Sequence, residues 1–241
     1  GAIVGSNIAN IGLVLGVSAL IRPLDVSDTV FRRDVPFMVL AALLLVGLGW
    51  DGRVGLVDGV VLLGALVAFT AAVLRRVQAN QSAISDSERD EMPDAKVRDV
   101  AVVVGGIVAL VLGSRWLIDG SESLLAAAGF SDIFIGLTVL ALGTSLPELA
   151  ASVVAAVRGE AEFSVGNVVG SNIYNILAVI GIVAVVTPIG VAPGVRGFEF
   201  PALLAFTAAI VGVMAYRERI TRVDGAALTV GYGVFVYLLL P

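Results

Sequence analysis

The sequence contains no cysteine and no histidine, and only one of its 15 basic residues, Lys96, is a lysine. Without cysteine, the chain can form neither disulfides nor thiolate metal sites. Without imidazole as well, zinc, copper and iron lose their preferred ligands, which leaves oxygen-only sites for hard cations. Charge is also scarce, and 15 basic against 20 acidic residues offer no basic surface to a nucleic acid. We therefore expect no nucleic-acid partner.

Apolar residues dominate instead. They make up 58% of the chain, charged residues only 15%, and the mean hydropathy is +1.01. A soluble domain carries roughly 25% charged residues. A chain of 241 residues cannot bury so much apolar surface in one core, so most of this surface must face lipid. The composition therefore predicts a membrane protein.

Eight apolar runs approach the length of about 20 residues that a helix needs to cross the membrane. They cover residues 3–21, 35–50, 54–74, 99–118, 131–157, 163–187, 198–216 and 224–240. We predict an all-α, polytopic protein that spans the cell membrane several times. Its expected partner is the lipid bilayer, and no required protein partner is evident.

A polar segment, residues 78–98, divides these runs into three and five. If the first residue lies outside, alternation places 12 of the 15 basic residues on the cytoplasmic side, which is the excess that the positive-inside rule predicts. We therefore interpret residues 78–98 as a cytoplasmic linker. It would join the remainder of a first membrane repeat, residues 1–77, to a second repeat, residues 99–241.

The evidence for a repeat is a polar run that occurs twice, as GAIVGSNIAN at 1–10 and as GNVVGSNIYN at 166–175. The two copies begin the first and sixth predicted spans, so they have opposite orientations in the membrane. This pattern is typical of inverted-topology repeats in secondary transporters, whose site lies near the midplane. We predict five-helix halves with about eight transmembrane helices present. The first-half counterpart of residues 143–148 would precede Gly1, so we expect an amino-terminally truncated chain and ten helices in the intact protein.

The fifth predicted span contains the run GTSLPE at 143–148. A carboxylate in mid-span costs about 2.5–3.5 kcal/mol, and a proline inside a helix costs about 3 kcal/mol. We therefore expect a helix that breaks at Pro147 and directs oxygens into a cavity. Residues at i, i+3, i+4 and i+7 share one helical face, and here they are Ala141, Thr144, Ser145 and Glu148. Carbonyl, hydroxyl and carboxylate oxygens form a ligand set for a hard cation.

Polar side chains also recur on two other predicted spans. Asn167, Ser171 and Asn175 stand at i, i+4 and i+8 in the sixth span, and Ser6 and Asn10 repeat the last two in the first span. Serine and asparagine also join transmembrane helices through hydrogen bonds, so helix packing is the alternative explanation. The duplication beside an acidic helix favours a binding site.

Two further acids, Asp58 and Glu199, lie near the starts of predicted spans. The helix dipole stabilises a carboxylate at a helix amino terminus. We therefore expect both acids at the membrane interface, and we place Glu148 alone at mid-membrane depth.

These motifs resemble the cation/calcium exchanger superfamily, specifically prokaryotic sodium/calcium exchanger-like membrane proteins. The family combines a G-T-S-x-P-E helix with a G-N-x-x-G-S-N-x-x-N helix in each of two inverted repeats. This chain has both motifs at 143–148 and 166–175, and the second motif at 1–10 with Ala2 in place of its first asparagine. The resemblance implies a transporter of calcium and sodium ions, not an enzyme, and no cofactor.

The resemblance also implies roles for single residues. Glu148 would be the carboxylate shared between calcium and sodium, while Thr144 and Ser145 would add hydroxyl or carbonyl oxygens. The other implied ligands are the Ala141 carbonyl and the side chains of Ser171, Asn175, Ser6 and Asn10. Asparagine at position 175, where potassium-coupled members tend to have aspartate, favours exchange without potassium.

The predicted function is secondary active antiport of sodium and calcium through a midplane site of oxygen ligands. Two alternatives stay open. One is a proton/calcium antiporter of the same superfamily, in which Glu148 would carry the proton. The other is an inactive truncated membrane fragment.

Overall fold

The structure is a computed structural model that describes residues 1–83, 97–127, 129 and 139–240. These residues form helices joined by short turns and two-residue strands, and the segments labelled η are π-helical. In chain order, the helical segments are α1 (Ala2–Ala9), η1 (Asn10–Leu15), α2 (Gly16–Ile21), η2 (Val30–Asp34), α3 (Val35–Leu48), α4 (Leu56–Ala83), α6 (Val97–Ala127), α8 (Ala141–Arg158), α9 (Ala161–Tyr174), η4 (Asn175–Ile180), α10 (Gly181–Val186), η5 (Val195–Glu199), α11 (Phe200–Arg217) and α12 (Arg222–Leu238).

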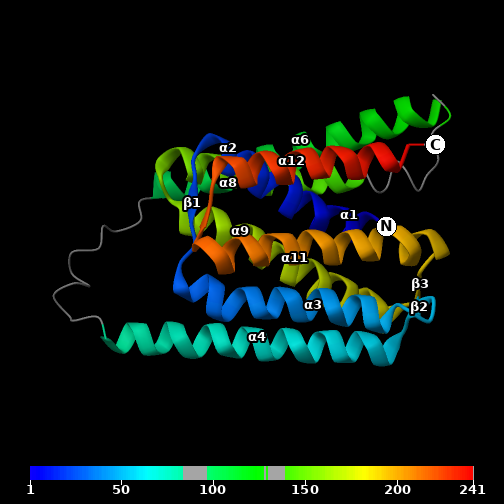
Figure 1. The fold of residues 1–241 in the computed structure, drawn as a ribbon, viewed down its shortest axis with the longest axis horizontal. Helices are drawn as coiled ribbons and strands as arrows, with labels where there is room; N and C mark the ends of the chain where they lie inside the picture. Colours follow the sequence, from blue (N-terminus) through cyan, green and yellow to red (C-terminus); the bar gives the residue numbers. More distant parts are fainter. Residues whose placement is uncertain (84–96, 128, 130–138, 241) are drawn as a thin grey trace.

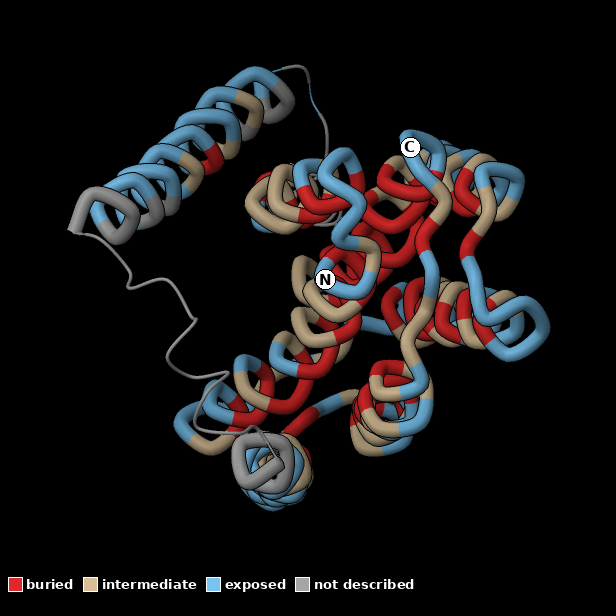
Figure 2. The backbone as a smooth tube through the Cα atoms, turned by 90° about the vertical axis from the view of Figure 1, so that its left-hand side faces the viewer, coloured by how far each residue is buried: buried red, intermediate tan, exposed pale blue. Residues whose placement is uncertain are grey.

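The helices lie side by side in an elongated bundle (Figure 1). A view along the bundle shows that buried residues turn towards its middle and exposed residues outwards (Figure 2). Many of the exposed residues are large and apolar, including Val57, Val67 and Val186. Such an outer surface is suited to contact with lipid.

Each predicted span overlaps a helical segment, although residues 131–138 of the fifth span lie outside the described residues. Within the described part of the chain, five helical stretches are long and apolar enough to cross a membrane. They are Ala2–Ile21, Leu56–Gln78, Val104–Ser121, Ala161–Val186 and Val195–Arg217. A mostly helical fold with candidate membrane spans is therefore present, and the number of eight spans stays a prediction.

The predicted linker can be compared with the structure only at its edges. Helix α4 continues through residues 78–83, and α6 begins at Val97. Residues 84–96 lie outside the described residues.

The helix that carries the GTSLPE run does not break, contrary to the prediction. Helix α8 continues from Ala141 to Arg158 with Pro147 inside it. Gly143 has a packing role, because a Cβ atom there would collide with the side chain of Ile118 on α6. Irregular, π-helical backbone occurs instead in η1 and η4, which begin at Asn10 and Asn175, and also in η2 and η5. Single π-helical turns inside α-helices often occur at functional sites.

The order of elements recurs along the chain at a constant spacing. The bounds of η1 and η4, of α2 and α10, and of η2 and η5 each differ by 165 residues. The same spacing aligns the two G-S-N runs in the sequence. Two stretches of sequence therefore adopt the same succession of α- and π-helical turns.

Short antiparallel ladders connect residues before the polar segment 78–98 with residues after it, at opposite ends of the bundle (Figure 1). At one end, β1 (Leu24–Asp25) pairs with β4 (Arg219–Ile220), and at the other, β2 (Arg53–Val54) pairs with β3 (Ile189–Gly190). Each ladder thus joins a loop before the polar segment to a loop after it. An ion pair between Arg219 and Asp25, 3.1 Å apart, adds to the first ladder.

Glycines allow close helix crossings inside the bundle. A Cβ atom on Gly225 of α12 would lie 2.7 Å from the carbonyl oxygen of Gly16 on α2. A Cβ atom on Gly59 of α4 would lie 2.8 Å from the carbonyl oxygen of Gly181 on α10. Small residues let membrane helices approach backbone to backbone in this way.

The two acids near helix starts have different surroundings. Asp58 lies in the first turn of α4, where its Oδ2 accepts the Gly55 N–H at 2.8 Å, as is common near helix amino termini. Glu199 is buried inside the bundle, with only 3% of its surface exposed, and its position at the membrane interface stays a prediction. Because η5 extends the helix towards Val195, Glu199 lies one turn inside it.

Candidate cation site

Helix α8 presents most of the predicted ligands. Ala141 and Ser145 are buried, Glu148 is half-buried, and Thr144 is exposed. Their spacing places them along one side of a continuous helix. That helix packs against α1, η1, α2 and α9, so its polar side can meet the two G-S-N helices.

The first contact between predicted ligands joins α8 to α1. The hydroxyl oxygens of Ser6 and Ser145 lie 3.0 Å apart. The Ser145 hydroxyl also lies 3.5 Å from the Ser6 carbonyl oxygen. Both side chains are buried, and the two residues are 139 positions apart in the sequence. The structure therefore brings these two predicted ligands together.

The second contact joins α8 to α9 at the carboxylate. The Ser171 side chain lies close enough to the Glu148 carboxylate to interact with it. Nearby, the Asn167 side chain lies 3.4 Å from the Glu148 carbonyl oxygen and donates to the Ser152 hydroxyl at 3.1 Å. Asn167 thus fastens α9 to α8 beside Glu148, which is a packing role.

Thr144 and Ala141 interact within their own helix. The Thr144 hydroxyl donates to the carbonyl oxygens of Leu140 at 2.9 Å and Ala141 at 3.1 Å. Among the described residues, Thr144 makes no hydrogen bond to a predicted ligand on another helix. These two positions therefore offer oxygens on the α8 side of the site without a cross-helix hydrogen bond.

A cluster of four asparagines lies where the two G-S-N helices meet. Asn10 Nδ2 donates to Asn172 Oδ1 at 3.0 Å, and Asn172 Nδ2 donates to the Asn7 carbonyl oxygen at 3.3 Å. Asn175 Nδ2 lies 3.5 Å from Asn7 Oδ1. Asn7 and Asn10 are fully buried, Asn172 is 2% exposed, and Asn175 is half-buried. In this asparagine cluster, the predicted ligands Asn10 and Asn175 are linked through Asn172 and Asn7, which lie between them in the series of contacts.

Asn7 and Asn172 were not among the predicted site residues. The signal was available, because both copies of the G-S-N-I-x-N run contain an asparagine at this position. The predicted stripe followed a spacing of four residues along one helix, and this spacing passes over Asn7 and Asn172. Their role arises between helices and is visible only once the helices are packed.

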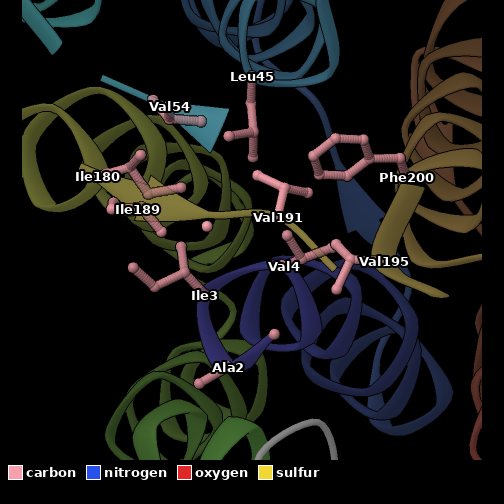
Figure 3. Close-up of a pocket in the computed structure, with 12 residues that line it drawn as sticks. Ala2, Ile3, Val4, Leu45, Val54, Ile180, Ile189, Val191, Val195 and Phe200 are labelled. Carbon is pink, nitrogen blue, oxygen red and sulfur yellow. The ribbon is translucent and has the colours of Figure 1, made fainter. Parts of the chain in front are cut away.

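A separate apolar cavity of about 210 Å³ lies at the start of α1 (Figure 3). The labelled side chains around it are aliphatic or aromatic, and they include Ile3, Leu45, Ile180 and Phe200. Such walls offer no side-chain oxygens to a cation. The polar contacts described above, rather than this cavity, form the candidate cation site.

Comparison with known proteins identifies the family of this chain. A sequence model of the family described as sodium/calcium exchanger protein matches residues 1–75 and 99–240. The chain belongs to this family. The chain is 32% identical to the inner membrane protein YrbG of Escherichia coli, over 99% of this chain and 76% of that protein. It is 28% identical to the sodium/calcium exchanger MaX1 of Methanosarcina acetivorans, over 99% of this chain and 79% of that protein.

A solved structure is similar as well. The sodium-calcium exchanger NCX_Mj superposes with a TM-score of 0.78 at 29% identity, over 98% of this chain and 75% of that one. The resemblance to the cation/calcium exchanger superfamily is confirmed. The chain is a membrane protein from a family of ion exchangers rather than enzymes, and this family transports sodium and calcium.

Proposed function

We propose that the protein is a secondary active antiporter that exchanges sodium for calcium through a site at the membrane midplane. The observation that carries the proposal is the position of Glu148. Its carboxylate lies half-buried against Ser171, one helical turn from the cross-helix contact of Ser145 with Ser6. A partly desolvated carboxylate is costly unless a positive charge compensates it. A hard cation surrounded by these oxygens supplies that charge.

Antiport follows from competition for the same oxygens. Calcium and sodium both take oxygen ligands, so a site that holds one excludes the other. If the protein changes access only when the site is filled, each calcium ion that leaves must be replaced by sodium. The inward sodium gradient then drives calcium out of the cell.

The ligands that we propose come from the elements that meet around Glu148. Helix α8 contributes Glu148, Thr144, Ser145 and the Ala141 carbonyl. The two G-S-N helices contribute Ser171 and Asn175, and Ser6 and Asn10. The hydrogen bond between Ser6 and Ser145 and the proximity of Ser171 to Glu148 support this set.

We also propose the membrane arrangement that this function needs. The chain would cross the cell membrane eight times, as two inverted repeats in residues 1–77 and 99–241 with a cytoplasmic linker at 78–98. The spacing of 165 residues between matching elements supports this arrangement, and so do the ladders that join the two repeats at opposite ends of the bundle. In such transporters the site lies between the repeats.

The experiment is calcium uptake by liposomes that contain the 241-residue chain. An outward sodium gradient and a proton gradient are applied separately, and radioactive calcium is counted inside. The proposal predicts uptake that follows the sodium gradient. Uptake that follows only the proton gradient would replace it with proton/calcium exchange, in which Glu148 carries the proton. No uptake under either gradient would contradict transport by this chain and identify it as an inactive fragment.

A further inference from the structure

The asparagine cluster contains two residues, Asn7 and Asn172, to which the proposed cation site assigns no role. Both are nearly or fully buried. A spacing of 165 residues relates Asn7 to Asn172 and Asn10 to Asn175. The two side-chain contacts, Asn10 with Asn172 and Asn175 with Asn7, are therefore equivalent under the repeat. Each proposed ligand asparagine contacts a partner asparagine in the other copy.

The orientation of the Asn172 amide follows from its neighbours. Its Nδ2 lies 3.3 Å from the Asn7 carbonyl oxygen, and a carbonyl oxygen can only accept. The Asn172 amide must therefore turn its nitrogen towards Asn7 and its oxygen towards Asn10. Because an amide oxygen can only accept, Asn10 must in turn present its nitrogen to Asn172, at 3.0 Å.

This series of hydrogen bonds determines which side-chain atom of Asn10 has no hydrogen-bond partner. The Asn10 nitrogen is occupied, and its Oδ1 is buried without a hydrogen-bond partner among the described residues. A cation requires an oxygen, and an amide rotated by 180° would present a donor instead. Asn10 begins the π-helical segment η1.

We propose that Asn172 is a positioning residue that holds the Asn10 amide with its oxygen free for the cation, and that Asn7 does the same for Asn175. This inference rests on the proposed cation site and assigns it two residues that do not themselves touch the ion. The interaction by which Asn7 orients Asn175 is the weaker of the two. Its contact with Asn175 is longer, at 3.5 Å, and its own Nδ2 has no partner among the described residues.

The test is sodium binding to the purified chain, measured by calorimetry in detergent, in a double-mutant cycle. Asn172→Ala removes the group that orients Asn10, so sodium affinity should fall about tenfold. Asn10→Asp carries two equivalent oxygens and presents one in either orientation. In this background residue 10 also lacks a donor for the Asn172 Oδ1, so Asn172→Ala removes no orienting hydrogen bond and should not weaken sodium binding by more than about twofold. Residues that act through one another give such non-additive cycles.

A matched control uses Asn175, the proposed ligand asparagine that contacts Asn7 rather than Asn172. In an Asn175→Asp background, Asn172→Ala should still weaken sodium binding about tenfold, because no hydrogen bond joins these two residues in the described structure. Circular dichroism and the melting temperature without sodium check that each variant folds. If Asn172→Ala does not fold, Asn172→Ser removes the same amide and takes its place in the cycle.

The outcomes separate this inference from the function on which it rests. A wild-type chain that binds neither sodium nor calcium would contradict the cation site and the positioning role together. Normal sodium affinity in Asn172→Ala, with a wild-type chain that binds, would overturn the positioning role alone. Equal losses in the wild-type and Asn10→Asp backgrounds would also overturn it, because Asn172 would then act independently of Asn10.

Discussion

The two G-S-N helices, residues 2–21 and 161–186, have the same backbone conformation, but the hydrogen bonds of their asparagines differ in length. Asn10 donates to Asn172 at 3.0 Å, and Asn172 is itself held by a backbone carbonyl. Asn175 makes a longer contact of 3.5 Å with Asn7. The repeat therefore preserves the α- and π-helical turns of this helix but not the lengths of its side-chain hydrogen bonds.

The acids that follow the two helices differ in the same way. Asp34 and Glu199 are 165 positions apart, and both are buried at the start of a helix that has a proline in its first turn. Asp34 accepts hydrogen bonds from the neighbouring Arg33, whereas Phe198 stands in the matching place beside Glu199. Glu199 Oε2 has no hydrogen-bond partner among the described residues. The two halves thus share an architecture and differ in how their polar groups are satisfied.

The largest expected effect comes from the glycine helix crossings, which should be equally close in both halves. Gly225→Ala and Gly59→Ala each place a methyl group against a backbone carbonyl, under 3 Å away. Each should lower the free energy of unfolding by about 2 kcal/mol. Gly233→Ala is the control, since nothing lies within 4 Å of its Cβ, and it should be neutral or gain up to about 1 kcal/mol. Denaturant unfolding in detergent measures all three. A loss at only one of the two crossings would show that the halves pack differently.

A smaller effect should separate the two buried acids. Asp34→Asn leaves Arg33 without its ion pair in a mostly buried place that solvent still reaches, so we expect a loss of roughly 1–2 kcal/mol. Glu199→Gln removes the desolvation cost of a charge and leaves no ion pair broken, because Glu199 Oε2 has no hydrogen-bond partner among the described residues, so we expect a change below about 1 kcal/mol. Thermal unfolding of the two variants provides the comparison. Equal losses of stability would mean that a favourable interaction compensates the buried Glu199 carboxylate to the same extent as Arg33 compensates Asp34.

The smallest effect compares the two proposed ligand asparagines. Asn10→Leu should weaken sodium binding about tenfold, which is about 1.4 kcal/mol, and Asn175→Leu should weaken it less. Calorimetric titration measures both affinities, with melting temperatures taken in the absence of cations. If the leucine variants unfold while residual binding is unchanged, hydrogen bonding between helices was the correct explanation for the polar stripes.

Much of the fold could be predicted because the bilayer imposes it. Long apolar runs have few alternatives to membrane helices, and each of the eight runs overlaps a helical segment. The proline expectation failed because α8 continues through Pro147. The burial of Glu199 could not be predicted, because it depends on a π-helical extension that hydrophobic periodicity does not reveal.

The candidate site was predictable where one helix defines it and less so where several helices meet. The face of Ala141, Thr144, Ser145 and Glu148 follows from helical spacing alone. The roles of Asn7 and Asn172 depend on which residues of two crossing helices face each other. Sequence periodicity describes one helix at a time, so it cannot supply that register.

The central claim is that Glu148 binds the transported cation, and the most direct measurement is the melting temperature of Glu148→Gln with and without calcium. A ligand that binds only the folded chain at 100 times its Kd stabilises it by about 2.7 kcal/mol. Calcium should therefore raise the melting temperature of the wild-type chain and of the control Glu160→Gln, whose carboxylate is exposed in the turn between α8 and α9. Glu148→Gln should melt at or above the wild-type temperature without calcium and should not respond to it. A calcium-dependent rise of normal size in Glu148→Gln would contradict the account.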